Sequence, residues 1–169
     1  SAASDVYKRQ ARAVFAETGY HHAQQDFDCS VSTRFDVELI DTPTAPFATA
    51  AWVHVPVEHG QTRRVLVWSV HLAPWDYGPY AALNGEDPAV INAQPEERQR
   101  QEQIAQILEL TAQLAEPDAP VIIAGDFNSP ATLDWTQRGD LPDYRWLPTD
   151  APLEAGFADA FLSLIHISE

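Results

Sequence analysis

Three side chains with complementary chemistry stand where apolar runs of the sequence end. His71 follows the run Val65–Val70, and Asp126 and Asn128 follow Val121–Ala124 and a glycine. A carboxylate can take a proton from water or bind a hard cation, an amide can donate to a phosphoryl oxygen, and an imidazole can transfer a proton. These groups together fit hydrolysis by an activated water. The alternative is structural: the Asp–Phe–Asn turn caps a strand-to-loop transition, and His71 is a hydrogen-bonded strand-end residue.

The strands that must position these residues are predicted from alternation of apolar and polar side chains. One face of the run Arg63–Leu72 is apolar and comprises Leu66, Trp68, Val70 and Leu72. Phe47–Val57 is a second β-rich run, and the intervening Glu58–Gln61 predicts a hairpin. Val31–Ile40 also alternates and is predicted to be one strand.

A helix and a further strand are predicted after this hairpin. Pro95 suits a first helical turn, and the apolar spacing that follows predicts a helix ending before Pro117. Val121–Ala124 is predicted to be a short buried strand, so the order strand, helix, strand indicates a layered α/β unit. The segment Ala73–Gln94 contains several prolines and glycines and is predicted to be a long, functional loop.

Composition narrows the class of protein. The chain of 169 residues carries a net charge of −15 and a single cysteine, Cys29, which excludes a disulfide or zinc-finger scaffold. No basic cluster is visible, so tight non-catalytic binding of nucleic acid is not expected. An acidic site can still receive a phosphate through a bound divalent cation. We expect a monomer without a transmembrane segment, whose cellular location the sequence does not indicate.

The two ends of the sequence resemble translated transposase adapters from a sequencing library. Ser1–Gln10 and Leu162–Glu169 can be encoded by stretches of DNA that are reverse complements of each other. Unrelated protein termini have no reason to share that relation. We therefore expect a partial domain over residues 11–161, flanked by segments that do not belong to its fold.

The chain resembles the endonuclease/exonuclease/phosphatase (DNase I-like) family of metal-dependent hydrolases. Gly125–Asn128 matches the family's GDFN motif, and Val70–Leu72 is similar to its strand-end HL motif. Further segments resemble stretches of bacterial members in the same order: Ser32–Phe35, Trp75–Tyr80, Leu133–Thr136 and Gly156–Phe161. The resemblance covers nearly all of residues 11–161.

This resemblance implies an α+β fold, a four-layer α/β/β/α sandwich, with a Mg²⁺ or Mn²⁺ site and attack of water on phosphorus. It implies that Asp126 orients or deprotonates the water and contacts the metal. It also implies that Asn128 binds the phosphate and the nucleophile and is a second residue at the metal. His71 would donate to the phosphoryl or leaving oxygen. Asp159 would steady a histidine from outside this chain, or else cap the small-residue turn in which it stands.

The sequence departs from the family pattern at both ends. The family's metal-binding glutamate lies upstream of this chain, and its carboxyl-terminal Asp–His pair lies downstream. Glu17 and Glu38 do not stand in a suitable context to replace the glutamate. We therefore expect the fragment to be inactive and its parent protein to be active, since loss of one member of a catalytic unit costs orders of magnitude in rate.

The other candidate residues receive simpler interpretations. Tyr77 and Tyr80 are candidates for substrate contact, whereas most of the tryptophans are expected to pack in the core: Trp52, Trp68, Trp135 and Trp146. Most of the histidines are expected to be structural or surface residues: His21, His22, His54 and His59. Arg98 and Arg100 are expected to line the solvated start of the helix, where one of them could contact phosphate.

Three interpretations of the whole chain stay open. The first is a hydrolase of phosphoesters, whose substrate could be a nucleic acid, a lipid head group or a sugar phosphate. The acidic charge favours a small or lipid-borne phosphoester over duplex DNA. The second is a non-catalytic interaction domain that retained the fold without the metal. The third is a fragment that does not fold alone, because missing strands leave open sheet edges.

Overall fold

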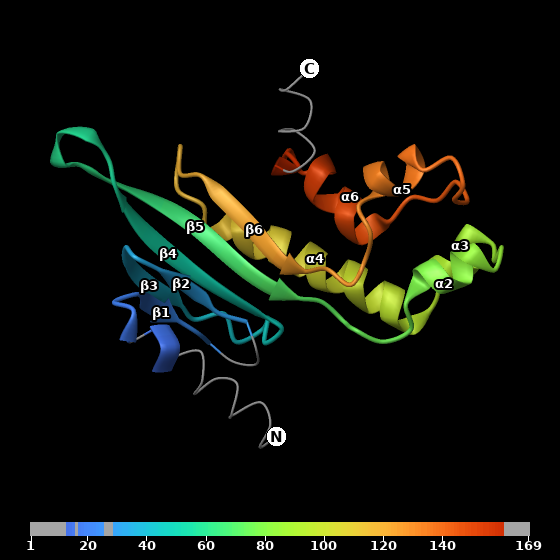
Figure 1. Ribbon diagram of the computed structural model, residues 1–169, viewed down its shortest axis with the longest axis horizontal. Helices are drawn as coiled ribbons and strands as arrows, with labels where there is room; N and C mark the ends of the chain where they lie inside the picture. Colours follow the sequence, from blue (N-terminus) through green and yellow to red (C-terminus); the bar gives the residue numbers. More distant parts are fainter. Residues whose placement is uncertain (1–12, 16, 26–28, 161–169) are drawn as a thin grey trace. The chain divides into compact units, whose positions relative to one another are not determined.

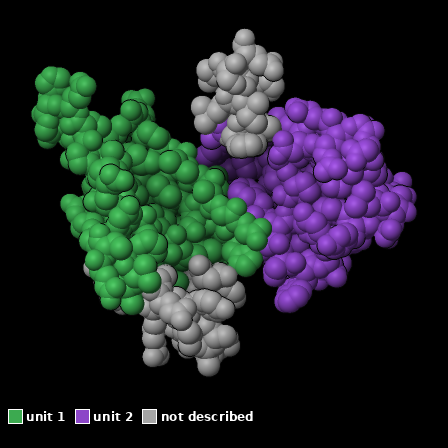
Figure 2. All heavy atoms as spheres, in the orientation of Figure 1, with its two compact units in different colours: residues 1–71, 111–126 green, residues 72–110, 127–169 purple. Residues whose placement is uncertain are grey.

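The computed structural model of the chain describes residues 13–15, 17–25 and 29–160. The terminal segments interpreted as adapter-derived, residues 1–10 and 162–169, lie outside these described residues. The chain divides into two compact units, and Figure 2 shows them in different colours. Unit 1 comprises Ser1–His71 and Thr111–Asp126, and unit 2 comprises Leu72–Leu110 and Phe127–Glu169. The described strands belong to unit 1, and most of the described helices belong to unit 2. The mixed α and β content expected from the sequence is therefore confirmed.

The strands of unit 1 form two sheets within the described part of the chain (Figure 1). The smaller sheet pairs β1 (His21–Ala23) with β2 (Val31–Thr33) in antiparallel fashion. The larger sheet has the strand order β3 (Asp36–Ile40), β4 (Ala48–Pro56), β5 (Thr62–His71) and β6 (Val121–Asp126). The pairs β3–β4 and β4–β5 are antiparallel, and β5–β6 is parallel.

The predicted hairpin between β4 and β5 is confirmed. A short 3-10 turn, Glu58–Gly60, connects the strands, and Gly60 has a φ of +71°. A positive φ suits glycine because it has no Cβ to collide with the backbone. The register then runs from Pro56 opposite Thr62 to Ala48 opposite Val70.

The predicted inward face of β5 is also confirmed. Leu66 and Trp68 are fully buried, and Val70 is nearly so. A cluster that joins both sheets covers the opposite face of the larger sheet: it contains Ala23, Val31, Ala51 and Val53 with Val67 packed against it. Alternation along β5 therefore sends successive side chains into two different apolar layers.

The prediction of one strand over Val31–Ile40 is wrong. The chain bends at Arg34 and Phe35, so β2 and β3 belong to different sheets. The backbone N–H of Phe35 donates to Thr33 Oγ1 (3.1 Å), a local side-chain bond that favours a turn over a continuous strand. Leu39 is 43% exposed, because β3 lies at an edge of the larger sheet.

The last strand differs from its prediction in burial and in length. β6 extends to Asp126, and Ile122 on it is 50% exposed instead of buried. In the described sheet β6 pairs with β5 alone and forms the other edge. A short apolar run signals a strand without revealing how many neighbours that strand has.

The helices of unit 2 carry the chain between and after these strands. They are α2 (Gly78–Leu83), α3 (Pro88–Asn92), α5 (Thr132–Gln137) and α6 (Leu147–Glu154). The long helix α4 (Pro95–Leu114) crosses from unit 2 into unit 1 along the chain. Its predicted start at Pro95 and its end before Pro117 are confirmed, and Ile104 and Ile107 on it are fully buried. None of the helices in the described residues is both long and apolar enough to cross a membrane.

The prediction of a long loop over Ala73–Gln94 is wrong, because this segment contains α2 and α3. Its prolines begin helices, as proline readily does in the first helical turn: Pro79 stands at the start of α2 and Pro88 at the start of α3. The Asp87 side chain accepts a hydrogen bond from the N–H of Ala89 (2.8 Å) and caps α3.

The core of unit 2 is aromatic. Trp146 is fully buried and packs against the rings of Trp135 (centroids 5.0 Å apart) and Tyr144 (4.2 Å). The expectation that these tryptophans pack in the core is confirmed. The Tyr144 hydroxyl donates to Asn92 Oδ1 (2.7 Å), which ties this core to α3.

Burial, together with the smaller effect of the negative charge of Glu97, raises the pKa of Tyr144 from its ordinary value of 10.0 to about 12. On a rising pH scale the unfolded chain loses this proton at a lower pH than the folded chain. The contribution of the neutral phenol to the free energy of unfolding is therefore complete below pH 10 and is lost as pH rises through 12. We predict that tyrosinate absorbance of the chain shows an ionisation near pH 12 that Tyr144→Phe removes. A difference titration centred on pH 10 would contradict this assignment.

Candidate functional site

Two of the predicted catalytic residues face each other across the parallel pair β5–β6. His71 closes β5, Asp126 closes β6, and the two are register partners. Register partners on neighbouring strands place their side chains on the same side of a sheet, with the strands about 4.8 Å apart. The backbone N–H of His71 donates to the Phe47 carbonyl (3.0 Å), which fixes the end of β5 from its other side. His71 is half-buried and Asp126 is exposed, so both residues lie at the end of the sheet with access to solvent.

Gly125 allows this close approach. Its φ is +143°, a value that residues with a side chain rarely adopt. A Cβ at Gly125 would overlap the carbonyl oxygen of Val70 and stand 2.8 Å from its nitrogen. The glycine of the Gly–Asp–Phe–Asn turn is therefore required by the fold, and it places Asp126 beside His71.

Asn128 holds the chain just after this point. It adopts a φ of +48°, a left-handed conformation that asparagine tolerates better than most residues. Its Nδ2 donates to the carbonyl of Leu72 (3.0 Å), the residue that follows His71 along the chain. Asn128 therefore has a structural contact in this turn, and the same bond fixes the orientation of its amide.

The segment after β5 displays aromatic side chains. Trp75 is 75% exposed, Tyr80 is 69% exposed and Tyr77 is 38% exposed. The rings of Tyr77 and Tyr80 meet edge to face with centroids 5.4 Å apart. The predicted contacts of Tyr77 and Tyr80 with substrate stay predictions, and Trp75 joins them as a residue of the same segment.

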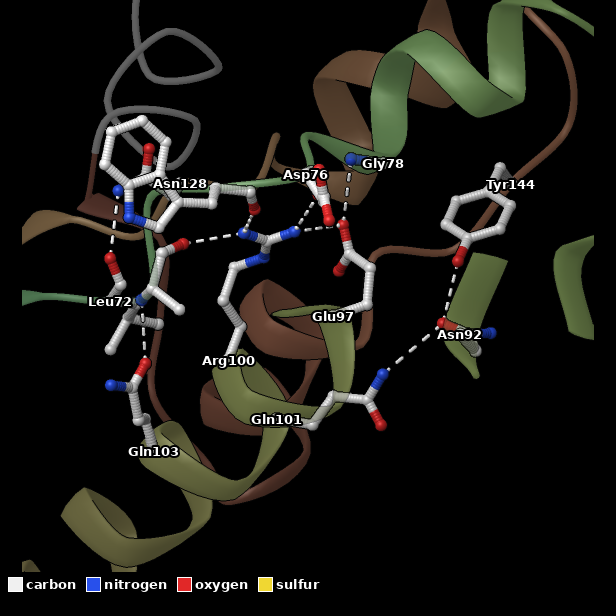
Figure 3. A network of polar contacts seen from close by, with 12 residues as sticks. Leu72, Asp76, Gly78, Asn92, Glu97, Arg100, Gln101, Gln103, Asn128 and Tyr144 are labelled. Carbon is white, nitrogen blue, oxygen red and sulfur yellow. Dashed lines mark hydrogen bonds and ion pairs between the residues drawn. The ribbon is translucent and has the colours of Figure 1, made fainter. Parts of the chain in front are cut away.

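Arg100 contradicts its prediction. It is fully buried rather than solvated, and it bonds to backbone carbonyls and to Glu97 instead of being available to a phosphate (Figure 3). Arg98 is exposed as expected and pairs with Glu102. The helical spacing of the sequence could have predicted this burial. Glu97 and Arg100 lie on the same face of α4 as the buried Ile104 and continue that face toward the start of the helix.

The remaining candidates are Asp159 and the histidines of β1 and β4. Asp159 is half-buried in the segment after α6, and its role toward a histidine stays a prediction. The histidines of β1 and β4 make local contacts, as in the pairs of His21 with Asp36 and of His54 with Glu38. Glu38 also pairs with Arg64 (3.7 Å).

The donors of this region fit part of a magnesium site. Within the described ranges no group of three or more His, Cys, Asp or Glu side chains is placed to hold a metal ion. Asp126 offers a carboxylate and Asn128 an amide oxygen, which are ligands that Mg²⁺ accepts. Because Mg²⁺ commonly takes one or two carboxylates and completes its shell with water and substrate phosphate, these two residues fit it as partial ligands.

Comparison with known protein families gives a match over most of the chain. A sequence model of the Endonuclease/Exonuclease/phosphatase family matches residues 7–162. The chain belongs to this family. Its members are typically enzymes that hydrolyse phosphoesters, and they generally depend on a divalent metal ion. The resemblance noted in the sequence is thereby confirmed.

The chain is also similar to a protein whose activity is not stated. The chain is 34% identical over 129 residues to Uncharacterized protein F14F9.5 of Caenorhabditis elegans. The aligned region covers 70% of the chain and 41% of that protein, so the chain spans less than half of this relative's length. No solved structure matches the chain.

We predict that Gly125→Ala lowers the free energy of unfolding by about 2–4 kcal/mol, because a methyl group there meets both a strained φ and the Val70 backbone. Gly139→Ala is the matched control, since nothing lies within 4 Å of the place that its added methyl group would take, and it should change stability by less than about 0.5 kcal/mol. Urea unfolding followed by circular dichroism measures both. Equal midpoints for the two variants would show that β6 does not approach β5 this closely.

Proposed function

We propose that this chain supplies the histidine and aspartate of a metal-dependent phosphoester hydrolase that uses Mg²⁺ or Mn²⁺. The observation that carries the proposal is the register pair His71–Asp126 at the ends of parallel strands, in a chain of the Endonuclease/Exonuclease/phosphatase family. An imidazole and a carboxylate side by side can manage the two proton transfers that hydrolysis needs, one at the water and one at the leaving oxygen.

The proposed roles follow from what each group can donate or accept. Asp126 orients the attacking water, takes its proton and ligates the metal. His71 donates a hydrogen bond or a proton to the phosphoryl or leaving oxygen. Asn128, held by its bond to Leu72, presents its amide to the phosphate and to the metal. A bound divalent cation would supply charge neutralisation at the phosphate.

The substrate is proposed to be a small or lipid-borne phosphoester. A net charge of −15 repels a polyanion such as duplex DNA more strongly than a single phosphate group. The exposed aromatic residues Tyr77 and Tyr80 are proposed to contact the organic part of this substrate. Asp159 is proposed to orient a histidine that another part of the protein supplies.

The complete protein is proposed to have the four-layer α/β/β/α sandwich of its family. The two sheets of unit 1, which share one apolar cluster, support the two inner layers of that arrangement. We further propose that full activity belongs to the parent protein rather than to this chain alone, since Asp126 and Asn128 account for part of a magnesium shell.

We predict that the full-length parent protein hydrolyses bis(p-nitrophenyl) phosphate or p-nitrophenyl phosphate with Mg²⁺, and that EDTA abolishes the turnover. His71→Ala and Asp126→Asn should each lower kcat by about 10²–10³-fold, because each removes one proton transfer or charge contact. His21→Ala, at an exposed histidine of β1, is the matched control and should leave kcat unchanged.

Thermal melts of the variants exclude loss of folding as the cause of reduced turnover. Turnover by the parent that survives EDTA or both substitutions would refute the proposed roles. Robust, chelator-sensitive turnover by the present chain would refute its proposed dependence on the parent. A parent that binds no Mg²⁺ and shows no turnover would favour a non-catalytic interaction domain.

A further inference from the structure

A buried arginine holds the backbone of the segment that follows β5. Arg100 on α4 is fully buried, and its guanidinium donates to a series of carbonyl oxygens from the same short stretch (Figure 3): Ala73 (2.6 Å), Trp75 (3.0 Å) and Asp76 (2.8 Å). A loop turned toward a protein interior leaves such carbonyls without water, and each needs a partner. The guanidinium reaches all of them from two separate nitrogens held in one plane, a geometry that the single nitrogen of a lysine does not offer.

Glu97 completes this arrangement one turn earlier on α4. Its Oε1 accepts hydrogen bonds from Arg100 (2.7 Å) and from the N–H of Gly78 (3.1 Å). A Cβ at Gly78 would overlap the Glu97 carboxylate, so the glycine permits this contact. One turn later, Gln103 Oε1 accepts from the N–H of Ala73 (2.8 Å). A single face of α4 therefore binds the segment Ala73–Gly78 at both of its ends.

Stability alone does not explain the pair. Taking two charges out of water costs several kcal/mol, and apolar residues of the same volume often stabilise a protein equally well. Arg100 Nε and Glu97 Oε2 are buried without a hydrogen-bond partner among the residues that the structure describes, which adds to the cost. A buried charge pair retained at such cost is better explained by the specific shape that it imposes on the loop.

The imposed shape turns aromatic side chains outward. Asp76 has a φ of +45°, an unfavourable conformation that the bond from Arg100 to its carbonyl helps to hold. Its neighbour Trp75 is 75% exposed although its own carbonyl is bound inside. Tyr77 and Tyr80 follow directly. Exposed aromatic groups on a fixed backbone lose little conformational freedom when they bind a ligand.

We infer that Arg100, together with Glu97, is a positioning residue that holds Ala73–Gly78 so that Tyr77 and Tyr80 meet the substrate. The inference rests on the proposed function, and it assigns to Arg100 no contact with phosphate. Loss of the hydrogen bonds from the Arg100 guanidinium should therefore weaken substrate binding and leave the chemical step intact.

The first test concerns the loop in the present chain. Arg100→Lys keeps the positive charge beside Glu97 and removes the planar guanidinium group with its several donors. Hydrogen exchange at the amides of Ala73 and Gly78 should become at least about tenfold faster, because both are held by the same face of α4. Arg98→Lys, at a 65% exposed arginine of the same helix, is the matched control and should change neither amide.

The second test measures kinetics of the full-length parent protein with bis(p-nitrophenyl) phosphate. Arg100→Lys should raise KM by about tenfold and change kcat by less than about twofold, as expected for a residue that acts on binding. In a Tyr77→Ala/Tyr80→Ala background the same substitution should have no further effect on KM, because its target is already absent. Glu97→Gln, which keeps the acceptor for Gly78, should give a smaller rise in KM and serves if Arg100→Lys does not fold.

The two tests separate this inference from the proposed function. A wild-type parent without turnover would refute the proposed function, whereas the exchange experiment would still report whether Arg100 holds the loop. Unchanged exchange at Ala73 and Gly78 would refute the inference. So would a fall in kcat at constant KM, or an additive effect of Arg100→Lys in the background that lacks both tyrosines.

Discussion

The parallel pairing of β5 with β6 is the constraint on which the candidate site depends. Parallel strands need a crossover, and here the chain between them includes α4. The pairing brings the carboxyl ends of both strands to the same end of the sheet, where His71 is the register partner of Asp126. Gly125 makes the pairing possible, since any side chain at that position would meet the Val70 backbone. The turn that makes the pairing possible therefore also carries Asp126, for which we propose a catalytic role.

The helix α4 combines two kinds of buried surface. Its central part buries Ile104 and Ile107 without polar contacts, as an amphipathic helix should. Its first turns bury Glu97 and Arg100, whose charges bind the loop after β5. An apolar stripe needs only complementary volume, whereas a charged stripe must match specific carbonyl and amide groups. The polar end of α4 therefore restricts the conformation of the loop after β5 more strongly than apolar packing could.

The acidic balance of the chain explains why a cation belongs in the proposed chemistry. Several arginines of the described part are already engaged by neighbouring groups. Arg64 lies over the ring of Trp52 and pairs with Glu38, and Arg145 pairs with Asp150. Asp126 adds a further negative charge at the edge where a phosphate would arrive. A divalent metal ion would reverse the sign of that local field and allow an anionic substrate to bind.

The sequence by itself determined most of the local elements and gave the candidate site residues that we propose. Alternation along β5, the hairpin turn and the limits of α4 were readable because they depend on near neighbours in the chain. The tertiary structure decided what depends on distant partners: the exposure of Ile122 on an edge strand, and the burial of Arg100 under the carbonyls of Ala73 to Asp76. It also set His71 opposite Asp126, because register is fixed by pairing between segments that are far apart in sequence.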